Sequence, residues 1–352
     1  MNQAWRLGYT TGTCATAAAK AAAMALFVDT RPSSIEVGLL NGERVTLPVF
    51  NVKRFGASAT ATVRKDAGDD PDVTDQLLIQ TTVTVSKGKE IEFLAGEGVG
   101  VITLPGLAFP PGEPAINPGP RRQIIDALRE VTQSGLIVTV SIPGGNAVAE
   151  RTYNPKLGVV GGLSILGTDG RVRPFSHPRL LAALKLSVDV AKANGVSVPI
   201  LVPGHIGRRH AKTLLRCSET DVIEMSNEVG AMLSYCVERD YKRVVLLGHP
   251  GKLAKIITNH FDTHSSRSGS ATDAVRSVAE RIGIHVPSDL TTTEAIFMQL
   301  PETERHLLGR CVSEEVRVVV ETRFSELKVA IYLTNLGGSV LGFTGVAAPW
   351  VH

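Results

Sequence analysis

Short apolar segments alternate with turns rich in Gly, Pro and Asp over the first 145 residues. This spacing predicts a series of strands, with one alanine-rich helix before them and a second helix behind a Pro-Gly-Pro signal. The predicted strands are residues 34–39, 44–52, 57–65, 76–85, 90–94 and 135–142, and the predicted helices are residues 14–26 and 121–133. Such a mixture indicates an α+β domain.

From about residue 178 the pattern changes to apolar strands that alternate with helices. The strands 198–202, 221–225 and 243–247 are each followed by a predicted helix. This βαβαβ order predicts a parallel sheet with ligand sites at the carboxyl ends of its strands. The segments 316–321, 327–334 and 340–344 are predicted to be strands that complete the sheet or form a hairpin on its edge.

The fold class is therefore α/β plus α+β. We expect an N-terminal α+β domain over residues 1–150, which carries the alanine-rich helix. Residues 151–177 form a connecting glycine-rich segment, and residues 178–352 form a C-terminal Rossmann-like domain with a parallel sheet. A chain of 352 residues is longer than one ordinary hydrophobic core and suits two domains.

The composition argues against several classes of protein. The net charge of +3 is too small to predict nucleic-acid binding, and no apolar stretch reaches the length of a membrane span. The four cysteines are far apart and form no CxxC pair, which argues against a zinc site or a disulfide framework. We therefore expect a cytoplasmic protein whose partners are neither nucleic acid nor membrane.

A Gly/Thr loop, GYTTGTC at residues 8–14, leads directly into the alanine-rich helix. Thr13 is predicted to be its N-cap, and the open N–H groups with three threonine hydroxyls predict an anion site. The loop is not a nucleotide P-loop, because Lys20 lies nearly two turns inside the helix and the Gly-Lys-Ser/Thr ending is missing. The positive helix end would lower the thiol pKa of Cys14 and favour reactivity, but the favoured interpretation of Cys14 is a small residue packed at a tight helix start.

Two glycine loops in the second half lie between a strand and a helix. Gly204-His205-Ile206-Gly207 and Gly248-His249-Pro250-Gly251 have the context of a cofactor-binding turn, and Glu224 stands where a ribose-binding acid is expected. The alternative is that Glu224 caps the next helix and the glycines only turn the chain. The predicted cofactor-binding residues are Gly204, His205, Gly207, Glu224, Gly248, His249 and Gly251.

Two further loops in the first half carry weaker signals. The GEGVG loop at residues 96–100 leads into β-branched residues and a proline, so a tight turn and a ligand-lining loop are both open. The acidic loop 66–75 fails the calcium-binding template and fits a solvated turn. Within it, Asp69 and Asp70 are the candidate catalytic bases.

Several of these motifs, in this order, resemble the CbiD family of cobalt-precorrin-5B (C-1)-methyltransferases. The resemblance is dense over the first half of the chain and continues more thinly to about residue 265. It rests on GYTTGTC (8–14), KDAGDDPDVT (65–74), GEGVG (96–100), INP (116–118) with Arg121 and Arg122, TYNPKLG (152–158) and GGLSILGT (161–168).

The resemblance implies methylation of C-1 of cobalt-precorrin-5B by S-adenosyl-L-methionine, giving cobalt-precorrin-6A in anaerobic cobalamin biosynthesis. It implies a tetrapyrrole substrate that carries its own cobalt, with no protein-bound metal, and neighbouring corrin-pathway enzymes as further candidate partners. The ligands are expected in a cleft between the two halves. Because the substrate has many carboxylates, the candidate substrate-binding residues are Thr10, Thr11, Thr13, Lys20, Arg121, Arg122, Asn154 and Lys156.

Two other functions remain open at this point. One is a tetrapyrrole carrier or scaffold without methyl transfer. The other is a nucleotide-dependent enzyme that uses the C-terminal sheet. A doubly wound sheet hosts many functions, so its presence does not choose between them.

Overall fold

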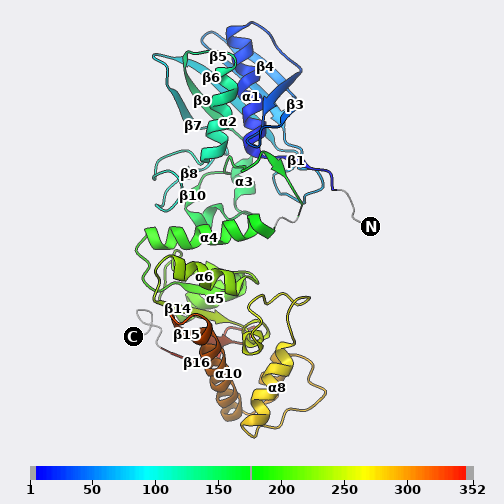
Figure 1. The fold of residues 1–352 in the computed structure, drawn as a ribbon, viewed down its shortest axis with the longest axis vertical. Helices are drawn as coiled ribbons and strands as arrows, with labels where there is room; N and C mark the ends of the chain where they lie inside the picture. The colour runs from blue at the N-terminus through cyan, green and yellow to red at the C-terminus, as the bar shows by residue number, and fades with distance from the viewer. Residues whose placement is uncertain (1–4, 175–176, 346–352) are drawn as a thin grey trace. The chain divides into compact units, whose positions relative to one another are not determined.

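A computed structural model describes residues 5–174 and 177–345 of the protein. The chain forms two compact units, Met1–His177 and Pro178–His352, each with its own sheets and helices (Figure 1). The glycine-rich segment 151–177 belongs to the first unit. The mixed α/β architecture predicted from the sequence is confirmed, with both antiparallel and parallel strands present.

The first unit is built around the alanine-rich helix α1 (Thr11–Phe27), of which 15 of 17 residues are buried. Thr10, not Thr13, is its N-cap: the Thr10 hydroxyl accepts from the backbone N–H of Thr13 at 3.2 Å. The helix therefore begins three residues earlier than predicted. Alanine side chains are small and let neighbouring elements come close to α1. The helix therefore packs against both α2 (Pro118–Arg129) and the sheet strands beside it.

The main sheet of this unit has the order β4-β5-β6-β9-β7 and is antiparallel except for the β7–β9 pair. Alternate residues of β5 and β6 are buried on the face that meets α1. A β2–β3 hairpin packs beside the helices, and the predicted strand 44–52 is in fact two strands. The strands are β2 (Ser34–Gly38), β3 (Arg44–Pro48), β4 (Phe50–Phe55), β5 (Ser58–Arg64), β6 (Leu78–Ser86), β7 (Ile91–Ala95) and β9 (Gly135–Ser141).

The remaining elements of this unit are short strands and turns that pack against one another through their backbones. The GEGVG loop turns the chain between β7 and β8, and Gly98 has a φ of +70°. A Cβ on Gly98 would overlap the carbonyl oxygen of Ile142, and one on Gly162 would overlap Gly98. These glycines are therefore required by close backbone packing. The elements are β1 (Gly8–Tyr9), β8 (Val101–Ile102), α3 (Gly145–Ala149), η1 (Asn154–Leu157), β10 (Val159–Val160) and β11 (Arg171–Val172).

The second unit contains a five-stranded sheet in the order β13-β12-β14-β15-β16. The first four strands are parallel, and β16 is an antiparallel edge strand paired with β15. In chain order this is the 2-1-3-4-5 arrangement of a doubly wound sheet, with its reversal between β12 and β14. The strands are β12 (Ile200–Val202), β13 (Val222–Glu224), β14 (Arg243–Gly248), β15 (Lys328–Thr334) and β16 (Val340–Thr344).

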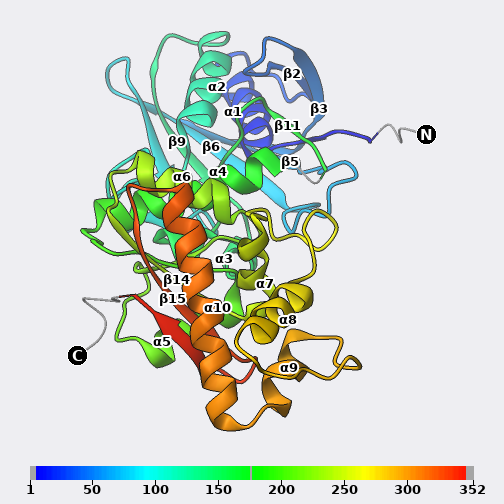
Figure 2. The same cartoon turned by 60° about the horizontal axis from the view of Figure 1, so that its bottom comes forward.

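Helices of the second unit pack on this sheet, with α5 against β12, β13 and β14 and the long α10 against β15 and β16 (Figure 2). Glycine lets α10 lie close to the edge strand β16, because a Cβ on Gly309 would overlap the Leu341 carbonyl oxygen. The helices are α4 (His177–Ala193), α5 (His205–Leu214), α6 (Val229–Glu238), α7 (Pro250–Leu253), η2 (Ala254–Thr258), α8 (Ala271–Arg281), α9 (Thr293–Gln299) and α10 (Glu302–Arg323).

One predicted strand of this unit is wrong. Residues 316–321 belong to α10, although the four valines in that segment favour a strand by propensity. Leu308, Val312, Val316 and Val320 are all buried, and their four-residue spacing is that of one helix face. Residues 328–334 and 340–344 are strands, as predicted. No helix within the described residues is long and apolar enough to span a membrane.

Enlarging a side chain on α1 should destabilise the first unit. Ala18 has no exposed surface, so Ala18→Leu forces extra carbon atoms into a filled core and should lower the free energy of unfolding by about 1–3 kcal/mol. Urea unfolding followed by circular dichroism measures this change. Ala193→Leu on the exposed end of α4 is the matched control and should change stability by less than about 0.5 kcal/mol. Equal effects from the two variants would contradict the packing role of α1.

Candidate functional site

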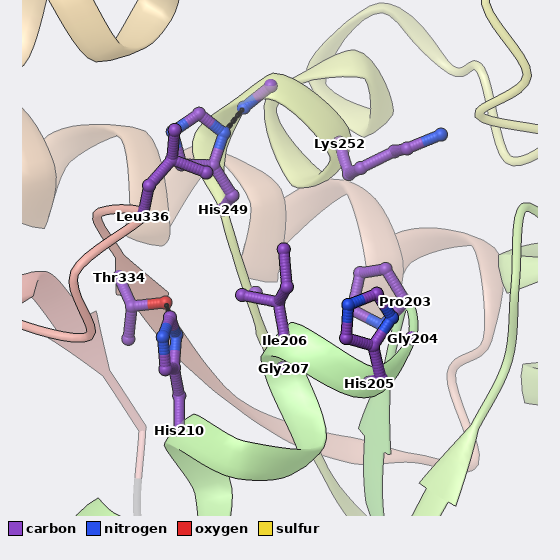
Figure 3. Close-up of a pocket in the computed structure, with 12 residues that line it drawn as sticks. Pro203, Gly204, His205, Ile206, Gly207, His210, His249, Lys252, Thr334 and Leu336 are labelled. Atoms are coloured by element: carbon purple, nitrogen blue, oxygen red, sulfur yellow. Dashed lines mark hydrogen bonds between the residues drawn. The ribbon is translucent and has the colours of Figure 1, made fainter.

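A cavity of about 400 Å³ lies in the second unit, at the carboxyl ends of β12, β14 and β15 (Figure 3). Its lining comes from the loop 203–207 after β12, the loop 248–252 after β14, and Leu336 after β15. His210 and Thr334 complete the lining. The cavity therefore lies where the strand order reverses, the place at which doubly wound sheets bind their ligands.

Six of the seven predicted cofactor-binding residues line this cavity. They are Gly204, His205, Gly207, Gly248, His249 and Gly251. The seventh, Glu224, is not part of the lining: its carboxylate accepts a hydrogen bond from Arg208 Nε at 3.0 Å, and it is 9% exposed. Nor does Glu224 cap α6, whose N-cap residue is Glu228. The interpretation of Glu224 as a ribose ligand stays a prediction without support from this arrangement.

The first turn of α5 opens onto the cavity. Gly204 precedes the helix in an extended conformation (φ 175°) and provides no side-chain cap for the first N–H groups. A Cβ on Gly204 would meet no atom within 4 Å, so the space beside it is empty. Gly207 lies against the sheet, where a Cβ would be 2.9 Å from the Val202 Cβ. The site therefore presents unpaired donors and the positive end of a helix dipole to a ligand.

His249 is held in one orientation by both of its ring nitrogens. Nδ1 accepts from the Gly251 N–H at 3.0 Å, and Nε2 lies 2.9 Å from Glu294 Oε2. These partners assign the neutral tautomer with its proton on Nε2, which donates to the carboxylate. Glu294 Oε1 in turn accepts from the Leu336 N–H at 3.2 Å. The loop after β14, α9 and the loop after β15 are thus tied into one wall of the cavity.

His210 is a third histidine of the cavity lining, and it is not among the site residues predicted from the sequence. It is 4% exposed, its Nδ1 lies 3.1 Å from Thr334 Oγ1, and Nε2 has no hydrogen-bond partner in the described part of the chain. Burial lowers the pKa of His210, and the nearby Arg209 adds to that effect. The available signal was its position three residues after Gly207, on the same face of α5.

The predicted anion site in the first unit is occupied by the chain itself. The Thr11 hydroxyl donates to the Ser164 carbonyl at 3.2 Å and accepts from the Leu166 N–H at 2.9 Å. The Thr13 hydroxyl donates to the Gly170 carbonyl at 2.9 Å, and Thr10 caps the helix. All three threonines are buried. Their role as substrate ligands stays a prediction, while the structure gives them a role in fixing the segment 164–170 over α1.

The predicted cationic residues of the first unit differ in how far contacts within the protein already engage their charged groups. Lys20 Nζ donates to Glu130 Oε2 at 2.6 Å and to the Glu36 carbonyl at 2.7 Å, so it holds α1 to its neighbours. The Arg121 guanidinium donates to the Ile116 carbonyl at 2.9 Å and to Glu113, and it stacks 3.7 Å from the centre of the Phe109 ring.

Arg122, in contrast, is exposed on α2. Its side chain is 80% accessible, and its nearest ion-pair partner, Asp126, is 3.8 Å away. A guanidinium in this position keeps its forked donors for solvent or a ligand. Of the two adjacent arginines, only Arg122 therefore has the freedom that carboxylate recognition requires.

Asn154 and Lys156 lie together in the 3₁₀ turn η1. Asn154 Nδ2 donates to the Gly162 carbonyl at 3.0 Å, and its Oδ1 accepts from Ser164 Oγ at 3.2 Å. The amide therefore fixes the glycine-rich segment from within. The Lys156 ammonium lies 5.0 Å from the centre of the Tyr153 ring. Contact of either residue with substrate stays a prediction.

The acidic loop is organised by its own ion pairs. Lys65, 1% exposed, donates to Asp72 at 2.8 Å, and Arg6 pairs with Asp66 at 2.5 Å. Asp69 is exposed and accepts from the Arg6 N–H at 2.7 Å, while Asp70 is partly exposed. The catalytic role of Asp69 and Asp70 is untested by this arrangement and stays a prediction.

The interpretation of Cys14 as a tightly packed residue at the helix start is confirmed. The side chain is completely buried, and desolvation raises its pKa to about 12. Burial thus outweighs the effect of the helix N-terminus, because the thiolate would lose all contact with water. Across residues 5–174 and 177–345, no group of three or more His, Cys, Asp or Glu residues is arranged to hold a metal ion.

Comparison with known proteins gives matches over the whole chain. Residues 1–174 match the family model CbiD. The cobalt-precorrin-5B C(1)-methyltransferase of Syntrophotalea carbinolica is 48% identical over 97% of this chain and 98% of its own length. The protein of the same name from Moorella thermoacetica is 40% identical over 99% and 97%. A crystal structure of the cobalamin biosynthesis protein cbiD from Archaeoglobus fulgidus matches at 26% identity, with coverage of 80% and 85% and a TM-score of 0.39.

The buried His210 should make stability depend on pH. Its folded-state pKa is below the ordinary value of 6.5, so the unfolded chain binds more protons and stability falls as pH decreases through that value. Between pH 7.5 and 5.5, this residue should account for a loss of up to about 1.4 kcal/mol that His210→Gln removes. Urea unfolding at both pH values tests this. The exposed His285→Gln should keep the wild-type dependence, and an unchanged dependence in His210→Gln would refute the assignment.

Proposed function

The chain belongs to the CbiD family, and from this premise we propose that it transfers a methyl group from S-adenosylmethionine to C-1 of cobalt-precorrin-5B. The proposal is carried by relatives named cobalt-precorrin-5B C(1)-methyltransferase. Their sequences are up to 48% identical to this chain over nearly its full length. The product would be cobalt-precorrin-6A, an intermediate of anaerobic cobalamin biosynthesis. Cobalt belongs to the substrate in this reaction.

We assign the methyl donor to the cavity at the carboxyl ends of β12, β14 and β15. Its volume of about 400 Å³ is in the range of small-molecule sites, and Pro203, Ile206 and Leu336 provide an apolar lining. The buried Nε2 of His210 makes no hydrogen bond within the described chain, and the space beside Gly204 is empty. Both features fit an adenosyl group, which combines a flat apolar ring with a few polar atoms.

The hydrogen bonds of His249 and the burial of His210 both suit a cationic donor. S-adenosylmethionine, when bound, supplies a methyl group already activated by a positively charged sulfur. His249 has no proton on Nδ1, because that nitrogen accepts the Gly251 N–H, and burial keeps the pKa of His210 low. Two imidazolium groups would repel the sulfonium, whereas neutral rings can accept or donate hydrogen bonds without that penalty.

The protein's contribution to the rate is mainly positioning. Since the leaving group is already activated, alignment of the methyl group with the ring carbon provides much of the acceleration. The His249–Glu294–Leu336 network holds one wall of the cavity through hydrogen bonds of 2.9 and 3.2 Å. A wall fixed at three points restricts the bound donor more than three independent loops would. For the tetrapyrrole, the exposed Arg122 is the first-unit cation that we propose as a carboxylate ligand.

Transfer of a labelled methyl group tests the reaction itself. Incubation of the protein with methyl-labelled S-adenosylmethionine and cobalt-precorrin-5B should place the label on the tetrapyrrole and release S-adenosylhomocysteine in equal amount. Mass spectrometry measures both products. Binding of the tetrapyrrole without any transfer would show a carrier instead. Binding of NADP, with no heat from S-adenosylmethionine or S-adenosylhomocysteine in calorimetry, would favour a nucleotide-dependent enzyme.

Filling the cavity tests the donor site. Gly204→Leu adds a side chain to empty space at an extended backbone position, so the fold should tolerate it. The affinity for S-adenosylhomocysteine should fall at least about tenfold, since the new side chain occupies ligand volume. Gly38→Leu in the first unit is the matched control, because a Cβ there also meets no atom within 4 Å. Calorimetry and the thermal midpoint of each variant provide the measurement. Undiminished affinity in Gly204→Leu would place the donor elsewhere.

A further inference from the structure

Two lysines near the donor cavity have no acidic partner within the described residues. Lys252 Nζ donates to Asn227 Oδ1 at 2.5 Å. Lys255 is 8% exposed, and its ammonium donates to Ser268 Oγ at 2.7 Å and to the Thr263 carbonyl at 3.2 Å. All of these acceptors are neutral, so the two positive charges are solvated by dipoles but not balanced by a carboxylate.

The charges around Lys252 and Lys255 do not neutralise these two ammonium groups. The acid whose charge acts on Lys252 is Asp262, which is already paired with Arg267 at 2.6 Å. Burial lowers the pKa of Lys252, and Lys255 lowers it further, whereas Asp262 opposes the shift. A half-buried ammonium next to a buried one is electrostatically unfavourable, and a bound anion would relieve it.

The topology places Lys252 at the point of strand reversal. Asn227 follows β13 and Lys252 follows β14, while β12 lies between these two strands. The Lys252–Asn227 hydrogen bond therefore links two loops across the carboxyl end of β12, where the uncapped first turn of α5 begins. Lys252 lines the cavity, and Figure 3 shows it on the side away from Leu336.

The hydrogen bonds leave donors for a ligand. Lys252 uses one of its three N–H groups on Asn227, so two remain. The Asn227 Oδ1 also lies 3.4 Å from Thr263 Oγ1, which fixes the amide with its Nδ2 group as a further donor. Lys255 holds the segment 263–268 in place through its two acceptors and thus supports this arrangement without needing to touch a ligand.

We propose that Lys252, oriented by Asn227, binds a carboxylate of a ligand in this cavity, and that Lys255 is a positioning residue for it. The identity of the ligand rests on the proposed function, which offers two sources of the same chemistry. One is the carboxylate of the methionine part of the methyl donor, and the other is a peripheral carboxylate of the tetrapyrrole. Both would be recognised by two ammonium N–H groups beside a helix N-terminus.

Lys252→Met tests the proposal with ligands that differ in the carboxylate. S-adenosylhomocysteine has it, and 5′-methylthioadenosine lacks it. If Lys252 binds the donor, affinity for S-adenosylhomocysteine should fall about 10- to 100-fold while affinity for 5′-methylthioadenosine stays unchanged. If Lys252 binds the tetrapyrrole, both affinities should persist and the KM for cobalt-precorrin-5B should rise about tenfold. Calorimetry and steady-state methyl transfer measure these quantities.

A second variant and a control keep the test independent of folding. Asn227→Asp places a negative charge against the Lys252 ammonium without changing its packing, so it should reproduce the loss of carboxylate affinity. Lys252→Arg should restore most of that affinity, and the exposed Lys242→Met should change nothing. Unchanged carboxylate affinity and KM in Lys252→Met and Asn227→Asp would overturn the proposal, as would an equal loss of 5′-methylthioadenosine binding.

Failure of the proposed function gives a different result. A wild-type protein that binds neither adenosyl compound has no donor site in this cavity, whatever the role of Lys252. The dissociation constant of cobalt-precorrin-5B, measured by absorbance titration of the wild type and of Lys252→Met, then still decides whether Lys252 binds a carboxylate. An equal constant in the two proteins would refute the lysine site.

Discussion

The reversal of strand order between β12 and β14 is the constraint on which the candidate site depends. The helices that follow these two strands must leave the sheet in different directions, so their first turns separate at the carboxyl edge. Packing against the sheet cannot fill that space, because Gly204 has no side chain and Gly207 is needed for contact with Val202. The cavity is therefore a consequence of the topology, and its chemistry is decided by the few residues of the surrounding loops.

The first turn of α1 in the first unit and that of α5 in the second unit have opposite surroundings. In the first unit, Thr10 caps α1 and the segment 164–170 covers its first turn, so the backbone donors and hydroxyl groups are satisfied within the protein. In the second unit, α5 begins without a side-chain cap and faces a cavity. Similar Gly-rich sequences thus serve packing in one case and an open donor set in the other. The difference comes from what the rest of the chain places over the turn, which a local motif does not encode.

This contrast explains how much the sequence could predict. Strand and helix alternation after residue 178 predicted the parallel sheet, and the Gly/His loops predicted six residues of the cavity lining, because both signals are local. His210 and Lys252 were missed, since their significance arises from an unpartnered Nε2 and from absent carboxylates, which only tertiary contacts reveal. Segment 316–321 is helical and not the predicted strand, because the four-residue spacing of its buried residues extends back to Leu308 on one helix face. For Cys14, the helix end alone would favour a lowered thiol pKa, whereas complete burial raises that pKa.

Charge is distributed around the cavity in a manner that suits a zwitterionic ligand. His210 is buried with a lowered pKa, and the carboxylate of Glu294 is engaged by His249 and the Leu336 N–H. The cationic Lys252 lies on another side, oriented toward Asn227 across the end of β12. A ligand with a positive sulfur and a negative carboxylate can then place each charge where the protein does not oppose it. The described cavity lining contributes one lysine, which suits recognition of a single carboxylate.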